Sequence, residues 1–223
     1  MNVIKVILVV VFLNLCACYG YASSRIKLNF DFDWKFSLTD NPGYAAIDYS
    51  DANWEQVQLP HDWNIKQKFD RKGIGSAAYL PEGIGWYRKT FFVPQSYKGK
   101  TVSILFDGIF QQSDVYINGK HLGHRPYGFC SIEYDLTLYL HTGKENVIAV
   151  RVNTTGGRPR WYAGAGIYRH VWLTAANPVH VATYGTYITT PEATEDHADV
   201  KIVTTVSNQS DKEQAITVTQ RLI

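Results

Sequence analysis

The chain has 223 residues, of which 45% are hydrophobic and 19% are charged. This composition supports a folded core and excludes a wholly disordered chain. The net charge is +2 and no run of basic residues gathers that excess into one segment, so a nucleic-acid binder that works through charge is excluded as well. Aromatic residues make up 14% of the chain, which suits both half-buried strands and stacking on sugars or bases.

The first residues have the pattern of a secretory signal. Lys5 precedes an apolar run that is too short for a membrane span of about 20 residues. Two cleavage positions fit: a signal peptide of residues 1–22, or a lipoprotein signal of residues 1–17 that leaves Cys18 for lipidation. We therefore expect an exported protein, in the bacterial periplasm or on the outer membrane as a lipoprotein, or else secreted. A strand or helix of the mature fold is the less favoured interpretation of this segment.

The cysteines predict a domain without disulfides. Cys16, Cys18 and Cys130 are the three cysteines of the chain, and either cleavage leaves no pair that could bridge separate parts of the domain. The mature fold must therefore rely on its core. Cys130 ends the aromatic stretch 127–130, with no histidine nearby to act as a base. We interpret it as a buried apolar residue rather than a nucleophile.

Short apolar or alternating runs recur through the rest of the chain, and no segment keeps a helical period. Their length and β-branched content predict an all-β protein. The pair Asn118-Gly119 between two runs predicts a tight hairpin turn, and one short helical turn is expected within residues 132–140. The predicted strands are 86–93, 101–106, 114–117, 147–152, 171–175, 181–189, 200–206 and 216–222.

Neighbouring residues of a strand point to opposite faces of the sheet. This alternation places one of Trp86 and Tyr87 inward and the other outward, so at least one of them belongs to the core. It also argues against a catalytic pair at His61 and Asp62, because these side chains would not orient one another. We predict a structural role for both.

A change of composition marks a boundary near residue 177. Before it the chain is dense in Trp and Gly; after it there is no Trp, and Thr and Val dominate. We predict one domain over residues 25–176 and the start of a second β domain over residues 178–223. The second has room for about three strands, at 179–190, 198–207 and 214–223, whereas an immunoglobulin-like sandwich needs about seven. The chain also ends within a strand pattern, so we expect a truncated product with a poorly stable C-terminal part.

Several groups of residues carry a family resemblance through their order and spacing. They are Trp54 with residues 57–63, residues 85–89, residues 106–108, residues 115–119 with 122–123, and residues 160–169 with 171–173. Over about residues 26–176 they resemble the N-terminal sugar-binding domain of glycoside hydrolase family 2, the β-galactosidase and β-glucuronidase family. The resemblance implies a jelly-roll, galactose-binding-like β-sandwich followed by a truncated immunoglobulin-like β-sandwich.

The resemblance also implies where the chemistry lies. Family members use two glutamates carried on a (β/α)8 barrel that follows the two β domains, and such a barrel alone needs about 250 residues. We therefore assign no catalytic residue and expect this chain alone to be inactive, although the complete gene product would be a β-galactosidase-like hydrolase. The expected partners are a β-linked glycoside or oligosaccharide, the catalytic barrel domain and a second copy of the chain, but no nucleic acid.

Two loops supply the candidate sugar-binding residues. In similar proteins, loops of the first domain reach the mouth of the barrel pocket, so Arg160, Trp161 and Tyr162 are expected to hydrogen-bond to a sugar and stack on it. Glu82, in the long loop 68–85, is expected to line the same edge. The alternatives are that Trp161 packs in the core, that Arg160 pairs with a carboxylate and that Glu82 is an ordinary surface charge.

No cofactor and no metal site are expected. Among the seven histidines only His121 and His124 are closely spaced, and a solvated hairpin is the favoured interpretation of that pair. A different class of function also fits a jelly-roll domain, namely a freestanding exported carbohydrate-binding module. We favour the accessory domain of a hydrolase, because a freestanding module would be expected to complete its last sheet.

Overall fold

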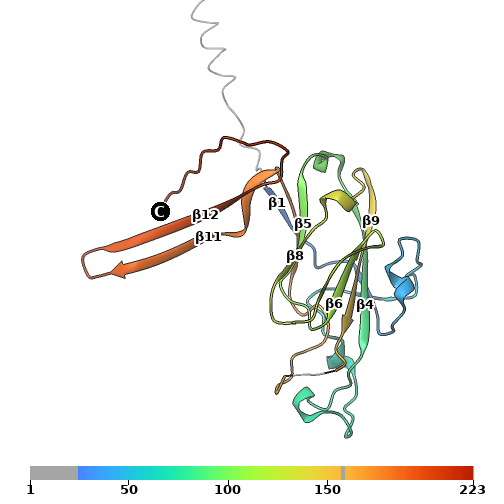
Figure 1. Cartoon of the computed structure of the whole chain (residues 1–223). Coiled ribbons are helices and arrows are strands. Elements are labelled where there is room, and N and C mark those ends of the chain that lie inside the picture. The colour runs from blue at the N-terminus through green and yellow to red at the C-terminus, as the bar shows by residue number, and fades with distance from the viewer. Residues whose placement is uncertain (1–24, 157–158, 223) are drawn as a thin grey trace, which may run out of the picture.

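The computed structural model describes residues 25–156 and 159–222, which form a β-sandwich and a long two-stranded ribbon (Figure 1). The two expected signal segments, 1–22 and 1–17, and Cys18 lie outside these residues. No helix within the described part is long and apolar enough to cross a membrane.

The first sheet of the sandwich has four antiparallel strands in the order β1-β10-β5-β8. It joins the two ends of the domain, because β1 pairs with β10. The strands are β1 (Arg25–Asn29), β10 (Val171–Ala176), β5 (Thr101–Phe106) and β8 (Ile132–Asp135).

The second sheet has six antiparallel strands in the order β3-β2-β4-β9-β6-β7. The two longest, β4 and β9, pair along ten residues each and form its centre. The strands are β3 (Glu55–Val57), β2 (Trp34–Ser37), β4 (Ile84–Val93), β9 (Lys144–Asn153), β6 (Ser113–Ile117) and β7 (Lys120–Arg125). The expected all-β jelly-roll sandwich is confirmed.

The core lies between the two sheets and follows the alternation of the strands. In β5 the inward residues are Val102, Ile104 and Phe106, and in β9 they include Val150 and Val152, all buried. Burial of each such side chain contributes about 1.5–3 kcal/mol. The alternation that predicted these strands is therefore also what holds the sheets together.

Tight turns join the strands, as the sequence predicts. Asn118 and Gly119 between β6 and β7 have φ values of 49° and 79°, the left-handed pair that a type I′ hairpin requires. The expected helical turn in residues 132–140 is a 3-10 turn that follows the short strand β8. The 3-10 turns are η1 (Pro42–Ala45), η2 (Trp63–Lys66), η3 (Gly75–Ala77), η4 (Gln95–Tyr97) and η5 (Thr137–Tyr139).

Residues 38–54 cover part of the outward face of the six-stranded sheet. Trp86 faces this layer, where its indole Nε1 donates to Asp40 at 2.9 Å and its ring meets the edge of Tyr44. Tyr87 faces the core, and both side chains are buried, at 1% and 0% exposure. The prediction that one of the two points outward is correct in direction, but the outward side is a second packed layer rather than solvent.

Cys130 corrects the prediction of a buried apolar residue. It is exposed, and it lies in the bend that follows β7 rather than in a strand. The bend turns residues 127, 129 and 130 toward solvent and buries Gly128 instead. Burial in this stretch follows the backbone turn, which composition alone does not reveal.

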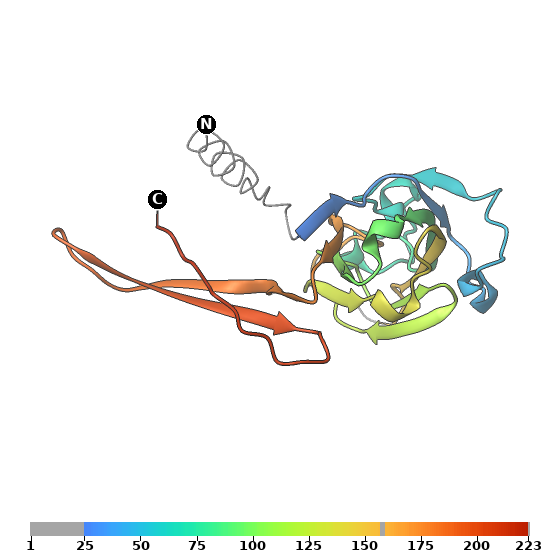
Figure 2. The same cartoon turned by 90° about the horizontal axis from the view of Figure 1, so that it is seen from above.

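The ribbon pairs β11 (Val179–Ala193) with β12 (Ala198–Asn208) and extends away from the sandwich (Figure 2). The predicted third strand is wrong, because residues 214–222 form no strand. The amide of Gln220 donates to the Thr204 hydroxyl at 2.8 Å, and Val218 borders the same cavity as Ile188 and Ile202 of the ribbon. This segment therefore lies over a face of the ribbon, where its backbone cannot join the ladder at the edge.

Candidate functional site

Loops from distant parts of the chain meet at the end of the sandwich opposite the ribbon's attachment (Figure 1). They are residues 61–67, 79–83, 127–130 and 159–168, which we call the loop rim. Gly83 and Thr154 fasten two of these loops together: Thr154 N donates to Gly83 O at 2.9 Å, and Gly83 N donates to the Thr154 hydroxyl at 3.0 Å. The loop rim is thus anchored where β4 begins and β9 ends.

Asp62 connects the loops of the loop rim through hydrogen bonds. Its Oδ1 accepts hydrogen bonds from Asn64 N at 2.9 Å and Ala165 N at 3.1 Å, and its Oδ2 accepts one from the Tyr162 hydroxyl at 2.5 Å. The carboxylate caps η2 and holds the segment that carries the candidate residues. Tyr162 is half-buried and is fixed by this contact.

Gly166 lets the loop segments approach closely. Its φ is 121°, and a Cβ at this position would lie 2.7 Å from the carbonyl oxygen of His61, so only glycine fits. The Gly166 backbone also exchanges two hydrogen bonds of 2.9 Å with Phe110. This close packing brings the loops around residues 61, 110 and 166 into one rigid unit.

His61 and Asp62 have separate partners, as the alternation predicts. His61 Nδ1 lies 2.9 Å from the hydroxyl of buried Tyr87, whereas Asp62 faces Tyr162. Burial lowers the pKa of His61, and burial raises that of Tyr87 well above its ordinary value. His61 and Tyr87 are therefore neutral parts of the packing beneath the loop rim. His61 and Asp62 do not form a catalytic pair.

Three exposed aromatic rings line up on the surface of the loop rim. Phe129 lies 5.6 Å from Tyr127 and 6.1 Å from Trp161, measured between ring centroids, and buried Phe110 supports it from below at 5.3 Å. Trp161 is 59% exposed, so it does not pack in the core. Tyr127 and Phe129 were not predicted as site residues, because Cys130 beside them was expected to be buried.

The charged candidates lie in the same loops. Arg160 is exposed and directly precedes Trp161, and Glu82 is half-buried next to Gly83, the residue that is fastened to Thr154. The structure thus brings all four predicted site residues into the loop rim. Exposed aromatic faces beside hydrogen-bonding side chains suit a ligand with both apolar and hydroxyl surfaces.

The histidine pair of the hairpin has a common partner. His121 Nε2 and His124 Nδ1 lie 3.0 Å and 3.1 Å from the same oxygen, Oδ1 of Asp114. Within residues 25–156 and 159–222, no group of three or more His, Cys, Asp or Glu side chains is placed to hold a metal ion. The hairpin is an exposed polar surface.

The jelly-roll sandwich is an architecture that lectin domains share with other proteins, and comparison with known proteins gives the family. A sequence profile described as glycosyl hydrolases family 2, sugar binding domain, matches residues 27–177. The chain therefore belongs to glycoside hydrolase family 2, and these residues are its sugar-binding domain.

Individual relatives agree with the profile. The chain is 44% identical to the β-galactosidase BoGH2A of Bacteroides ovatus, over 94% of this chain and 25% of that protein. It is 42% identical to a putative β-glucuronidase of Formosa agariphila, over 84% of this chain and 18% of that protein. The crystal structure of a β-glycosidase from Bacteroides vulgatus has a TM-score of 0.79 and 39% identity, covering 84% of this chain and 25% of that one. The chain thus spans a quarter or less of the length of these relatives.

Proposed function

We propose that this chain is the non-catalytic, N-terminal portion of an exported β-galactosidase-like glycosidase. The main support is the loop rim, where exposed Trp161 and its aromatic neighbours stand on a family 2 sugar-binding domain. Such side chains stack on the apolar faces of sugars. The substrate class is a β-linked glycoside or oligosaccharide.

The chemistry itself belongs to residues outside this chain. Retaining glycosidases need two carboxylates about 5–5.5 Å apart, and the resemblance places them on a barrel of about 250 residues. The sandwich and ribbon account for the described residues, and none of their carboxylates is assigned a catalytic role. We infer that the chain alone does not hydrolyse glycosides and that the sandwich shapes a pocket completed by the barrel.

The remaining parts follow from the same proposal. The ribbon β11–β12 is the start of an immunoglobulin-like domain, and the exposed cross-strand pair Tyr187 and Val203 marks the face that further strands would cover. Residues 1–22 or 1–17 direct export, with lipidation of Cys18 in the second case. Mass spectrometry of the mature N-terminus distinguishes the two: a diacylated Cys18 supports the lipoprotein, and an unmodified residue 23 supports the cleaved peptide.

A chimera tests the role of the loop rim. Residues 27–177 replace the matching segment of the Bacteroides ovatus β-galactosidase, which supplies the rest of the enzyme. We expect Trp161→Ala to lower kcat/KM for an aryl β-galactoside by about tenfold, since a lost aromatic contact costs on the order of 1.4 kcal/mol.

Phe92→Ala is the matched control. Phe92 is 61% exposed, close to the 59% of Trp161, but it lies at the end of β4 that is away from the loop rim. We expect it to leave kcat/KM unchanged. Equal kcat/KM values for the Trp161→Ala chimera and its parent would show that the loop rim takes no part in the pocket.

A further inference from the structure

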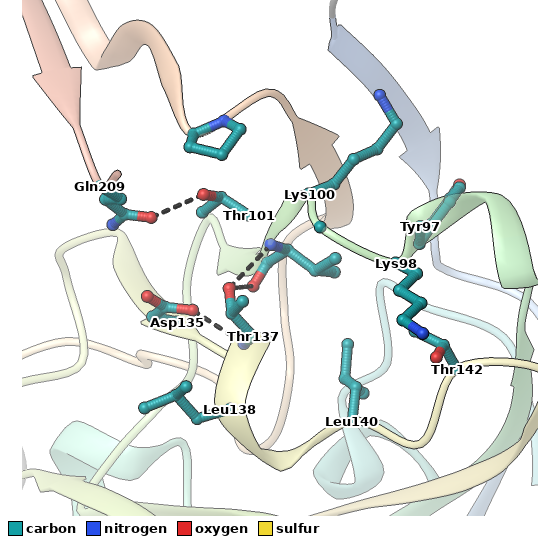
Figure 3. A pocket seen from close by; sticks show the side chains of 13 residues that line it. Tyr97, Lys98, Lys100, Thr101, Asp135, Thr137, Leu138, Leu140, Thr142 and Gln209 are labelled. Carbon is teal, nitrogen blue, oxygen red and sulfur yellow. Dashed lines mark hydrogen bonds between the residues drawn. The ribbon is translucent and has the colours of Figure 1, made fainter. Parts of the chain in front are cut away.

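Three adjoining cavities run along the outward face of the four-stranded sheet, beneath the base of the ribbon. Their volumes are about 570, 230 and 290 Å³. The first and second share Thr101, Asp135 and Gln209, and the second and third share Thr183. Figure 3 shows the first, where Thr101 donates to Gln209 across the gap between sandwich and ribbon. We call these three adjoining cavities together the sheet trough.

The strand β5 sets the direction of the sheet trough. Its outward residues Thr101, Ser103 and Leu105 line the successive cavities. At a rise of about 3.4 Å per residue these positions extend over about 14 Å. The sheet trough is therefore an elongated site and suits a chain-like ligand better than a single small molecule.

Side chains that both donate and accept hydrogen bonds recur along the lining, among them Thr101, Ser103 and Thr183. Glu133 Oε1 accepts from the Ser103 hydroxyl at 2.8 Å and from the Thr183 hydroxyl at 2.7 Å. This carboxylate orients one hydroxyl on the sandwich and one on the ribbon, so that the two walls have a fixed pattern of polar atoms. Such a pattern matches the hydroxyl groups of a sugar.

Charged residues of both signs line the sheet trough. Lys98, Lys100 and Asp135 border the first cavity, and Lys27 and Asp107 border the third. No part of the lining concentrates one sign of charge, which favours an uncharged ligand over a polyanion such as a nucleic acid.

An aromatic floor lies at one end. Trp172 of β10 is half-buried, and its indole Nε1 donates to Asp107 Oδ2 at 2.8 Å, which fixes the ring plane. Lys27, which is exposed, places its ammonium 4.1 Å from the ring centroid. Tyr184 of the ribbon borders the same cavity with a φ of 54°. A fixed indole floor next to a carboxylate is suited to stacking and hydrogen bonding with a pyranose ring.

We propose that the sheet trough is a second saccharide-binding site, which holds a neutral β-linked oligosaccharide with one ring on Trp172. It shares no residue with the loop rim, so it does not depend on the proposed function of that rim. Lys27 leaves the indole face when the sugar stacks there, because its ammonium competes for the same surface.

The experiment titrates the 223-residue chain with a β-linked galactotetraose and follows the indole N–H signals by NMR. The chain has six tryptophans, so each signal can be assigned by substitution. We expect a saturable shift of the Trp172 signal, and no such shift with galactose at the same concentration. Trp172→Ala should weaken binding at least about tenfold, whereas Trp161→Ala should leave this shift unchanged.

Two substitutions of residues that line the third cavity test the proposal even if the Trp172→Ala protein does not fold. Thr174→Arg fills the sheet trough beside Trp172 without entering the core and should abolish the shift. Lys27→Ala frees the indole face and should tighten binding about two- to fivefold. A Trp172 signal that does not change at saturating sugar, or binding that survives Thr174→Arg, would overturn the proposal; so would shifts confined to Trp161.

Discussion

Arg88 shows how one charged side chain organises the outer layer of the sandwich. It is 1% exposed, and a buried guanidinium must be paired to be tolerated. Its Nε donates to Asp51 at 3.1 Å, and its terminal nitrogens donate to the carbonyls of Ala46 at 3.0 Å and Tyr49 at 3.2 Å. The irregular segment over the sheet is therefore held by hydrogen bonds from within.

Trp86 tests whether that outer layer is a true packed layer. Its ring stacks on Tyr116 with centroids 5.7 Å apart, and the side chain is 1% exposed. Trp86→Ala should lower the free energy of unfolding by about 3–5 kcal/mol, measured by chemical denaturation, because it leaves a cavity. Phe92→Ala on the same strand is exposed and should change it by less than about 0.5 kcal/mol. A loss below about 1 kcal/mol for Trp86→Ala would mean that the outer layer contributes little.

Lys89 makes the stability depend on pH. Its ammonium donates to the carbonyls of Phe32 at 2.7 Å and Phe30 at 3.2 Å, and burial lowers its pKa from 10.5 to about 8. Between about pH 8 and 10 the unfolded lysine therefore keeps a proton that the folded one has lost. The free energy of unfolding should therefore rise with pH between about pH 8 and 10. Below about pH 8 Lys89 should add no pH dependence.

Urea denaturation at several pH values from about 7 to 9.5 measures that slope, below the titration of most tyrosines. Lys89→Met should remove the part of the slope due to Lys89, whereas Lys98→Met, at an exposed lysine, should keep it. The same slope in the Lys89→Met protein and in the parent would show that the buried ammonium is not its source.

At the scale of elements, alternation predicts the strands that cross the core. The predicted range 86–93 lies within β4, and the range 101–106 coincides with β5. Both strands cross the core, so every second residue along them must be apolar. The short strands β1 and β8, of five and four residues, were not predicted. Residues 216–222 have the pattern of a strand but lie over a face of the ribbon, so pattern alone was misleading there.

The candidate site was predictable to a similar extent. Family resemblance pointed to Arg160, Trp161, Tyr162 and Glu82, and the structure brings them into one loop rim. What the sequence could not reveal is how the loops are fastened, because the bonds of Asp62 reach residues about a hundred positions away. The exposed rings beside Trp161 were missed for the same reason: burial in a loop depends on its turns.

At the scale of the whole molecule, the sandwich and the ribbon differ in how they are stabilised. The sandwich buries a continuous core between its sheets, whereas the ribbon exposes large apolar residues along its length, among them Tyr184 and Ile188. A two-stranded ribbon alone is marginally stable in water. The architecture is that of a domain that presents loops at one end and continues into a further β structure at the other.

The hydrolysis of an aryl β-galactoside by the purified 223-residue chain, produced in a host without its own β-galactosidase, is the most direct measurement of the central claim. We predict no turnover above buffer at any chain concentration, because the proposed function places the pair of catalytic carboxylates on the barrel, outside these residues. Saturable turnover that rises in proportion to the concentration of the chain would contradict it, and would place a catalytic pair within these residues.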